Sequence, residues 1–158
     1  MADLETLVAL SKKTFVDKFG HIYDPVDLTT FLEKSHGEAM YLKLLSSPDT
    51  LVRVAETDDK TLAAYLVCGP LSLPANDAAP GAVELKRVYV DKPLQGRGLG
   101  THFINECLDW ATARGAPEIY LSVFSENEGA QALYQRFGFE KVDEFFFPVG
   151  KHNDLEFL

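Results

Sequence analysis

The chain has 158 residues, of which 46% are hydrophobic and 25% are charged. These are ordinary proportions for a globular protein, so they argue against disorder or a fibrous repeat and favour a single domain over residues 1–158. The net charge of −9 disfavours nucleic acid as a partner, because its phosphates would be repelled, and favours a cationic one, although acidity can also serve solubility alone.

Helical patterns fill the beginning of the chain. Apolar residues at helical spacing predict a first helix over residues 3–19, ended by Gly20. Asp24 and Pro25 are residue types that favour the N-cap and the first position of a helix, so a second helix is expected to begin there. A short third helix is expected over residues 38–45.

Strands and helices alternate in the remainder of the chain. Glycines, prolines and hydrophobic periodicity predict the later elements: strands at 51–56 and 62–69, a surface loop at 69–81, a strand at 83–90, a helix at 99–114, a strand at 118–123, a helix at 128–137, and strands at 139–149 and 154–158. This order predicts an α/β (α+β) fold with a mixed sheet.

Three glycines at alternate positions, Gly96, Gly98 and Gly100, lie where a predicted strand is followed by a helix. Without side chains there, the backbone N–H groups of the helix start can converge on a phosphate, and Arg97 could add a charge. Thr101 occupies the third glycine position of a dinucleotide fingerprint, and the lysine of a P-loop is lacking. A tight turn without a ligand is the structural alternative.

Two motifs resemble the signatures of the GNAT superfamily of N-acetyltransferases. Gln95-Gly96-Arg97-Gly98-Leu99-Gly100 matches its Q/R-x-x-G-x-G/A motif, and the segment from Asn127 to Phe139 resembles its second signature, an asparagine followed by A-x-x-L-Y and closing with G-F. The resemblance implies a GNAT fold, with a mixed central sheet of about six to seven strands, about four flanking helices and a splayed strand pair at the coenzyme site. It also implies acetyl-CoA as cosubstrate.

The resemblance assigns residues to the coenzyme. The backbone of Val88, Tyr89 and Val90 is expected to bond the pantetheine arm, as a sheet edge bonds an added strand. Asn127 matches an asparagine that contacts the arm, although capping of the next helix is an alternative role, and Arg136 could approach the phosphates or lie in solvent. The pyrophosphate is expected to lie on one continuous segment, composed of Gln95, Gly96, Arg97, Gly98, Leu99, Gly100 and Thr101.

The resemblance also assigns catalytic roles. Tyr134 matches the tyrosine that protonates the departing thiolate, with a buried core tyrosine as the alternative. The backbone N–H of Val88 is expected to stabilise the negative oxygen that forms during attack. Glu84 could take the proton of the amine, directly or through a water, or could be a strand carboxylate without a catalytic role. Direct attack on bound acetyl-CoA, in a ternary complex, is expected.

The acceptor is indicated by a further resemblance. The segments Thr14–His21, Asp24–Leu28 and Val149–Asp154 are similar to PaiA-type polyamine acetyltransferases, which implies a small cationic amine, first of all a polyamine. The alternatives are a protein amine, an antibiotic, or a non-catalytic acyl-CoA-binding module, and a homodimer is possible. Three acidic residues could line a polycation site or lie on a solvated helix face: Asp24, Asp27 and Glu33.

Other kinds of site are not expected. The histidines lack a metal-ligand spacing, so no metal is expected. No stretch approaches the ~20 apolar residues of a membrane-spanning helix, and Met1–Glu5 lacks the features of a signal peptide, so no membrane segment and a cytoplasmic location are expected. Cys68 and Cys107 are interpreted as packing residues rather than disulfide partners.

Overall fold

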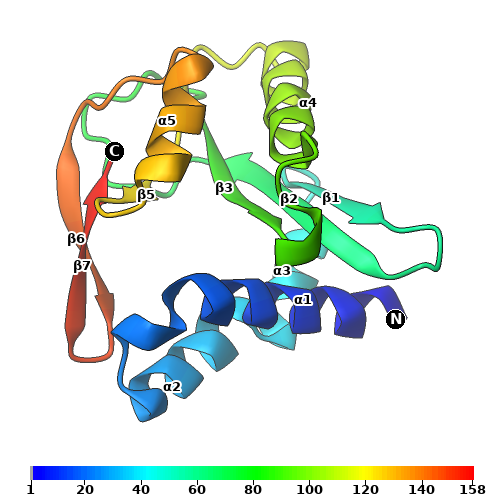
Figure 1. The fold of residues 1–158 in the computed structure, drawn as a ribbon. Helices are drawn as coiled ribbons and strands as arrows, with labels where there is room; N and C mark the ends of the chain where they lie inside the picture. Colours follow the sequence, from blue (N-terminus) through cyan, green and yellow to red (C-terminus); the bar gives the residue numbers. More distant parts are fainter. Residues whose placement is uncertain (1) are drawn as a thin grey trace.

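The computed structural model describes residues 2–158 and arranges them as helices around two β-sheets (Figure 1). The helices are α1 (Ala2–Phe19), η1 (Gly20–Ile22), α2 (Pro25–His36), α3 (Glu38–Ser46), η2 (Lys92–Leu94), α4 (Leu99–Ala113) and α5 (Glu128–Arg136), where η marks a 3₁₀ helix. The strands are β1 (Leu51–Glu56), β2 (Leu62–Pro70), β3 (Val83–Val90), β4 (Ile119–Tyr120), β5 (Val123–Phe124), β6 (Glu144–Val149) and β7 (His152–Phe157).

The two sheets together confirm the mixed α/β fold expected from the sequence. The first has the strand order β1-β2-β3-β4, antiparallel except for the parallel pair β3 and β4, and the second has the order β5-β7-β6. Figure 1 shows α4 and α5 on one side of the first sheet and α1 with α3 on the other. The described residues thus contain seven strands, as expected, and five α-helices where about four were expected.

Strand β2 is the centre of the core because both of its faces are covered. Its residues from Leu62 to Gly69 are all buried, and a strand buried on both faces is continuously apolar, as this one is. Alternate residues pack in opposite directions, so Leu66 contacts the cluster that contains Ile104 and Cys107 of α4, and Tyr65 contacts the cluster that contains Leu7 of α1. Both cysteines are buried and free, as expected.

Strand β3 contains a β-bulge and loses its parallel partner after its first two residues. Arg87 pairs with Val67 of β2 and Leu85 with the next residue, so Lys86 is the extra residue of the bulge. On the other edge, β3 pairs with β4 only at Val83 and Glu84. Along this edge, beyond the two pairs, no strand of residues 2–158 lies beside β3, which is the splayed pair expected from the sequence.

The strand predicted at 118–123 was wrong in extent, because its two ends pair with different partners. Its first part is β4, beside β3, whereas the chain after Ser122 becomes β5 and pairs with β7. A run of apolar residues does not reveal such a change of partner.

The strand predicted at 139–149 was also wrong in extent, since β6 begins only at Glu144. Phe139 closes the preceding helix instead, because its N–H donates to the carbonyl of Tyr134 at 3.2 Å and its ring packs edge-on against the Tyr134 ring, 6.0 Å between centroids. Gly138, with φ of +88°, makes this reversal possible. The last strand begins two residues earlier than predicted, and the other predicted ends differ by at most one residue.

Candidate active site

The glycine segment forms an open loop at the start of α4. Gly96 and Gly98 have φ of +78° and +82°, a conformation that glycine adopts without strain. Gly98 is the N-cap of α4 and provides no side-chain cap, so the first N–H groups of the helix lack a capping partner from this residue. The loop therefore has the free donors and the helix dipole that an anion requires.

A hollow of about 350 Å³ lies on this loop and extends to α5. It is lined by Val90, Leu94, Gln95, Gly96, Gly98, Leu99, Gly100, Thr101, Leu133 and Arg136. Arg97 is exposed and is not part of this lining, so the guanidinium beside the predicted phosphate site belongs to Arg136. The residue types and the backbone conformation fit a pyrophosphate.

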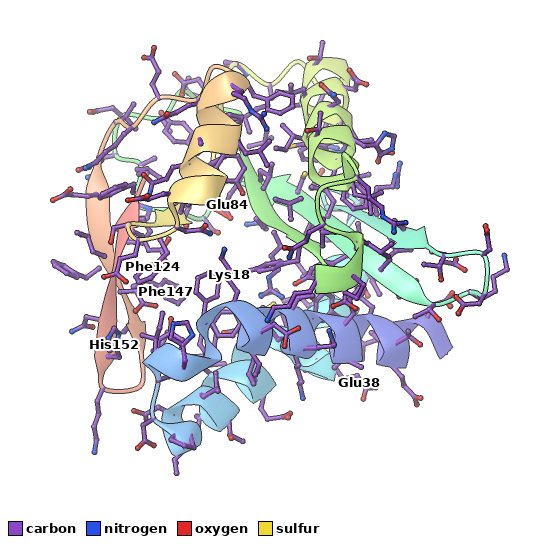
Figure 2. The ribbon with its side chains drawn as sticks, in the orientation of Figure 1. Lys18, Glu38, Glu84, Phe124, Phe147 and His152 are labelled. Carbon is purple, nitrogen blue, oxygen red and sulfur yellow. The ribbon has the colours of Figure 1, made fainter. Side chains whose placement is uncertain are left out.

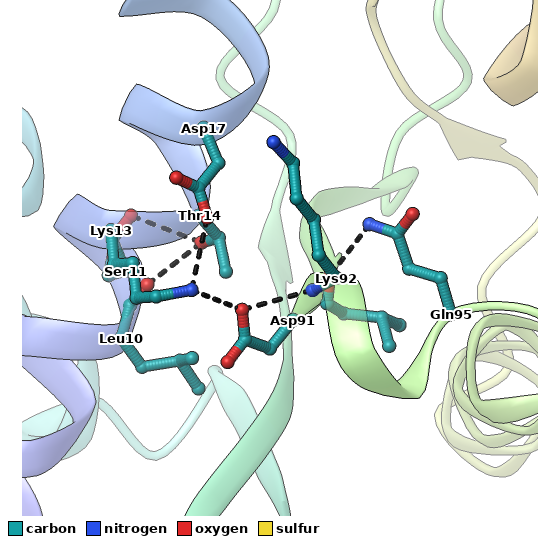
Figure 3. Close-up of polar contacts among 9 residues, drawn as sticks. Leu10, Ser11, Lys13, Thr14, Asp17, Asp91, Lys92 and Gln95 are labelled. Carbon is teal, nitrogen blue, oxygen red and sulfur yellow. Dashed lines mark hydrogen bonds and ion pairs between the residues drawn. The ribbon is translucent and has the colours of Figure 1, made fainter.

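The loop is anchored by polar contacts on both sides of η2 (Figure 3). Asp91 accepts the N–H of Lys92 at 3.0 Å and also forms an ion pair with Lys13 of α1, whose ammonium contacts Asp17 as well. These two carboxylates raise the pKa of Lys13. Gln95 donates its side-chain N–H to the carbonyl of Val90 at 3.0 Å, so its amide holds the loop to the end of β3.

Beyond its pairs with β4, strand β3 borders a gap, and only some residues of β3 direct their backbone groups into this gap. Asp91 donates its N–H to the carbonyl of Ala63 in β2 at 2.8 Å, and alternate residues of a strand direct their backbone groups to the same side. Tyr89 therefore faces β2, whereas Val88 and Val90 face the gap. Of the three residues predicted for the pantetheine arm, Val88 and Val90 are the ones whose backbone is placed to contact it.

Asn127 caps α5, which was its alternative role. Its Oδ1 accepts the N–H of Ala130 at 3.3 Å. The first turn is held further by Gln131, whose side chain donates to the carbonyls of Phe124 and Ser125 at 3.2 and 2.9 Å. These bonds fix the start of α5 relative to β5.

Tyr134 of α5 is half-buried and belongs to the residues packed against the α4 face of the core. Burial raises its pKa well above the usual value for tyrosine, with smaller contributions from Tyr89 and Cys107. The phenol is therefore protonated at neutral pH, as a general acid must be.

Glu84 is buried, with 5% of its surface exposed. Its Oε1 accepts the N–H and the hydroxyl of Ser72 at 3.2 and 3.1 Å, and its Oε2 accepts from the ammonium of Lys86 at 3.0 Å. This carboxylate, labelled in Figure 2, is thus bonded to Ser72 in the loop after β2 and neutralised by the ammonium of Lys86 on its own strand. It lies at the end of β3 that pairs with β4.

The three acidic residues considered for a polycation site have structural contacts instead. Asp24 accepts the N–H of Val26 at 2.9 Å as the N-cap of α2, Asp27 accepts the N–H of Lys151 at 3.0 Å, and Glu33 forms an ion pair with Lys12 at 2.5 Å. Carboxylates in these positions stabilise helices and loops.

Another group of acidic and aromatic side chains was missed by the sequence analysis. It lies on the face of the β5–β7–β6 sheet that is turned to the end of α1 and to α2, where Figure 2 shows Phe124, Phe147 and His152. Their rings pack on Phe19, Phe31 and Tyr23, at centroid distances of 5.9, 6.0 and 5.5 Å. We call this face, with the acidic residues Asp154 and Glu156, the acidic–aromatic wall.

Asp154 is the buried centre of this wall, with 3% of its surface exposed. It accepts a hydrogen bond from the Tyr23 hydroxyl and lies 2.7 Å from Nδ1 of His152. Burial and this hydrogen bond raise the pKa of Tyr23. No sequence motif pairs Tyr23 with Asp154, because 131 residues separate them.

Comparison with known proteins identifies the family. The model of the acetyltransferase (GNAT) family matches residues 15–139. The chain belongs to this family. It is an acetyl-CoA-dependent N-acetyltransferase, and a relative from Lactobacillus delbrueckii subsp. lactis, named an uncharacterized N-acetyltransferase, is 29% identical over 99% of this chain and 90% of its own length.

Two further similarities concern PaiA-type and spermine acetyltransferases. The solved structure of a PaiA N-acetyltransferase from Thermoplasma acidophilum in complex with coenzyme A has a TM-score of 0.75 at 20% identity, covering 98% of this chain and 92% of that chain. A Bacillus subtilis subsp. natto protein, named "Probable spermine N(1)-acetyltransferase", is 40% identical over 72 residues, which is 45% of this chain and 47% of that protein.

Among residues 2–158, no helix is long and apolar enough to cross a membrane. Within the same range, His, Cys, Asp and Glu side chains form no group of three or more that could hold a metal ion.

Proposed function

We propose that this enzyme transfers the acetyl group of acetyl-CoA to a primary amine of a small cationic molecule, and that a polyamine is the acceptor. The acidic–aromatic wall is the observation that carries this proposal. Carboxylates attract ammonium groups, and aromatic faces bind both cations and the alkyl chain between them. The similarity to proteins named for PaiA and for spermine acetylation supports the same acceptor.

The proposed coenzyme site has two parts. The loop from Gln95 to Thr101, with Arg136, would hold the pyrophosphate, and the free edge of β3 at Val88 and Val90 would bond the pantetheine arm as a neighbouring strand does. Asn127 sits at the start of α5, beside this gap. Acetyl-CoA supplies the activated acetyl group.

The proposed reaction is a direct transfer in a ternary complex. The amine must lose a proton before it attacks the thioester carbonyl, and the N–H of Val88 would bond the carbonyl oxygen as it becomes negative. Tyr134 would donate its proton to the departing thiolate sulfur. A base must take the proton of the amine at neutral pH, and Glu84 is the candidate that the sequence suggests.

A thiol-release assay tests the proposed acceptor. Purified enzyme with acetyl-CoA should release free thiol with spermidine or spermine, and mass spectrometry of the product should show one added acetyl group. An aminoglycoside and a peptide library serve as competing acceptor panels. Turnover of peptides or aminoglycosides without turnover of any polyamine would reject a polyamine as the acceptor. The assignment of acetyltransferase activity would be unaffected.

A further inference from the structure

Glu156 lies on the central strand of the second sheet, where the two sheets separate. It pairs with Phe124 of β5 on one side and with Phe145 of β6 on the other. Its half-buried carboxylate forms a hydrogen bond with Ser122, which lies between β4 and β5. The carboxylate is thus bound to the segment that opens the gap beside β3.

Glu156 and Tyr134 both lie within electrostatic reach of one side chain, Tyr89. Burial raises the pKa of Tyr89 to about 12, and the charge of Glu156 contributes to this rise. Tyr89 in turn contributes to the raised pKa of Tyr134. The carboxylate of Glu156 on β7 and the phenol of Tyr134 on α5 thus both interact electrostatically with Tyr89, the residue of β3 that follows Val88.

Glu156 differs from Glu84 in what its carboxylate contacts. Glu84 is paired with the Lys86 ammonium at 3.0 Å and bonded to Ser72. No ion pair of Glu156 is found within residues 2–158, and its hydrogen-bond partner is a neutral hydroxyl. A base that has no cation beside it keeps its affinity for the proton of an incoming ammonium.

We propose that Glu156, rather than Glu84, is the general base that deprotonates the acceptor amine; this rests on the proposed function for the location of the amine. The carboxylate takes one proton from the ammonium, and the nitrogen lone pair then forms the bond to the acetyl carbon. The carbon–sulfur bond breaks, the thiolate takes the Tyr134 proton, and the nitrogen loses its second proton, which returns to the Tyr134 phenolate through water. The carboxylic acid then releases its proton to water, which restores both groups. The products are the amide, coenzyme A and one proton.

The charges around Glu156 suit this role. Burial, followed by repulsion from Asp154 on the same strand, raises the pKa of Glu156 to about 7, while the Ser122 hydroxyl opposes the rise. Tyr89 from β3 and Tyr23, the residue after η1, also respond to its charge. A base with a pKa near the working pH is both available and strong enough to take a proton.

The test compares four single substitutions in the 158-residue enzyme, Glu156→Gln, Glu156→Asp, Glu84→Gln and Glu144→Gln, using whichever amine the wild type acetylates. Glu156→Gln should lower kcat at pH 7 by about 10²-fold, because a general base contributes roughly that factor or more. The loss should shrink as the pH approaches the pKa of the amine, since solvent then supplies the free amine. Glu156→Asp should recover part of kcat, and Glu144→Gln, an exposed acid on β6, is the matched control with wild-type rates.

Coenzyme A binding by calorimetry separates a lost base from a lost fold, and Glu156→Gln should bind it as the wild type does. A rate loss for Glu156→Gln that is the same at every pH would overturn the proposal, as would a pH-dependent loss in Glu84→Gln but not in Glu156→Gln. Because the comparison uses any accepted amine, failure of polyamines as acceptors rejects only the proposed function.

Discussion

The carboxylate of Asp27 accepts the backbone N–H of Lys151 at 3.0 Å, and this bond ties the turn between β6 and β7 to the first turn of α2. The two residues are 124 positions apart in the sequence. Gly150, in the same turn, has φ of +58°, and a Cβ added to it would lie 2.1 Å from Cγ of Asp27. The turn fits against α2 only because this residue has no side chain.

Gly150→Ala is expected to displace Asp27 and loosen the hairpin that carries Asp154 and Glu156. The left-handed backbone alone costs roughly 1–2 kcal/mol for an L-residue, and the collision with Asp27 adds to it. We expect a lower free energy of unfolding in urea and a raised KM for the amine. Gly115→Ala is the matched control, because Gly115 has φ of +68° with no atom within 4 Å of the added Cβ; an equal KM rise in both variants would contradict the role of the contact.

Tyr134→Phe is expected to lower kcat about 10²-fold, the size of a lost general acid. The KM for acetyl-CoA should change little, since the ring and its packing on Phe139 are retained. Thiol release measures the rate. Tyr120→Phe removes a hydroxyl that bonds Glu118 at 3.1 Å and should leave the rate unchanged; an unchanged rate in Tyr134→Phe as well would show that another group protonates the thiolate.

Gly98→Ala is expected to weaken coenzyme A binding, because an L-residue at φ of +82° strains the loop at the N-cap of α4. The strain of roughly 1–2 kcal/mol corresponds to about a tenfold rise in Kd if the loop relaxes out of its binding conformation. Calorimetric titration with coenzyme A measures this. Gly129→Ala, in the first turn of α5 with an ordinary φ and open space, should keep the wild-type Kd. Equal Kd values for all three proteins would exclude a role of the loop conformation.

His36 is a buried polar residue that links the helices of the first half to β3. Its Nδ1 lies 2.6 Å from the hydroxyl of Ser11, which also accepts a hydrogen bond from Tyr41 at 2.6 Å. Arg87 of β3 donates to the Tyr41 hydroxyl at 2.9 Å. Burial, followed by the positive charges of Arg87 and Lys12, lowers the pKa of His36 to about 2.

This lowered pKa makes stability dependent on pH in a defined direction. The unfolded chain takes up a proton near the ordinary histidine pKa of about 6.5, and the folded protein does not, so His36 costs stability progressively as the pH falls below about 6.5. The free energy of unfolding should fall more steeply in wild type than in His36→Gln between pH 6.5 and 5, by up to about 1.4 kcal/mol per pH unit. Urea denaturation measures both slopes. His21→Gln, at an exposed histidine, should retain the wild-type slope, and parallel curves for wild type and His36→Gln would refute the assignment.

The sequence predicted the structural elements correctly wherever local interactions determine them. Asp24 and Pro25 begin α2 as predicted because capping depends on neighbouring residues. The glycine loop was found because its conformation requires glycine, as Gly98 shows. The interruption after Tyr120 was missed, because strand partners are set by tertiary packing and not by the composition of the strand.

The candidate site was predicted in part for the same reason. The coenzyme motifs are continuous segments and can be read directly, and Tyr134 lies within one of them. Glu156 belongs to no motif, and its value as a base depends on Ser122, Asp154 and Tyr89, which the fold brings together from three separate segments. A carboxylate without a motif could be recognised only from its surroundings.

The extra residue Lys86 in β3 determines which backbone groups face the free edge of the strand. The backbone N–H and C=O groups of successive residues in a strand point to opposite edges. In a strand without the bulge, counting in steps of two from Val83 would place the backbone groups of Tyr89 at the gap, and those of Val88 and Val90 would point toward β2. Deleting one residue at this point would leave both signature motifs unchanged. It would still change which residues of β3 direct their backbone groups to the free edge. The proposed contacts of Val88 and Val90 with the coenzyme thus require the one extra residue in β3, which neither sequence motif contains.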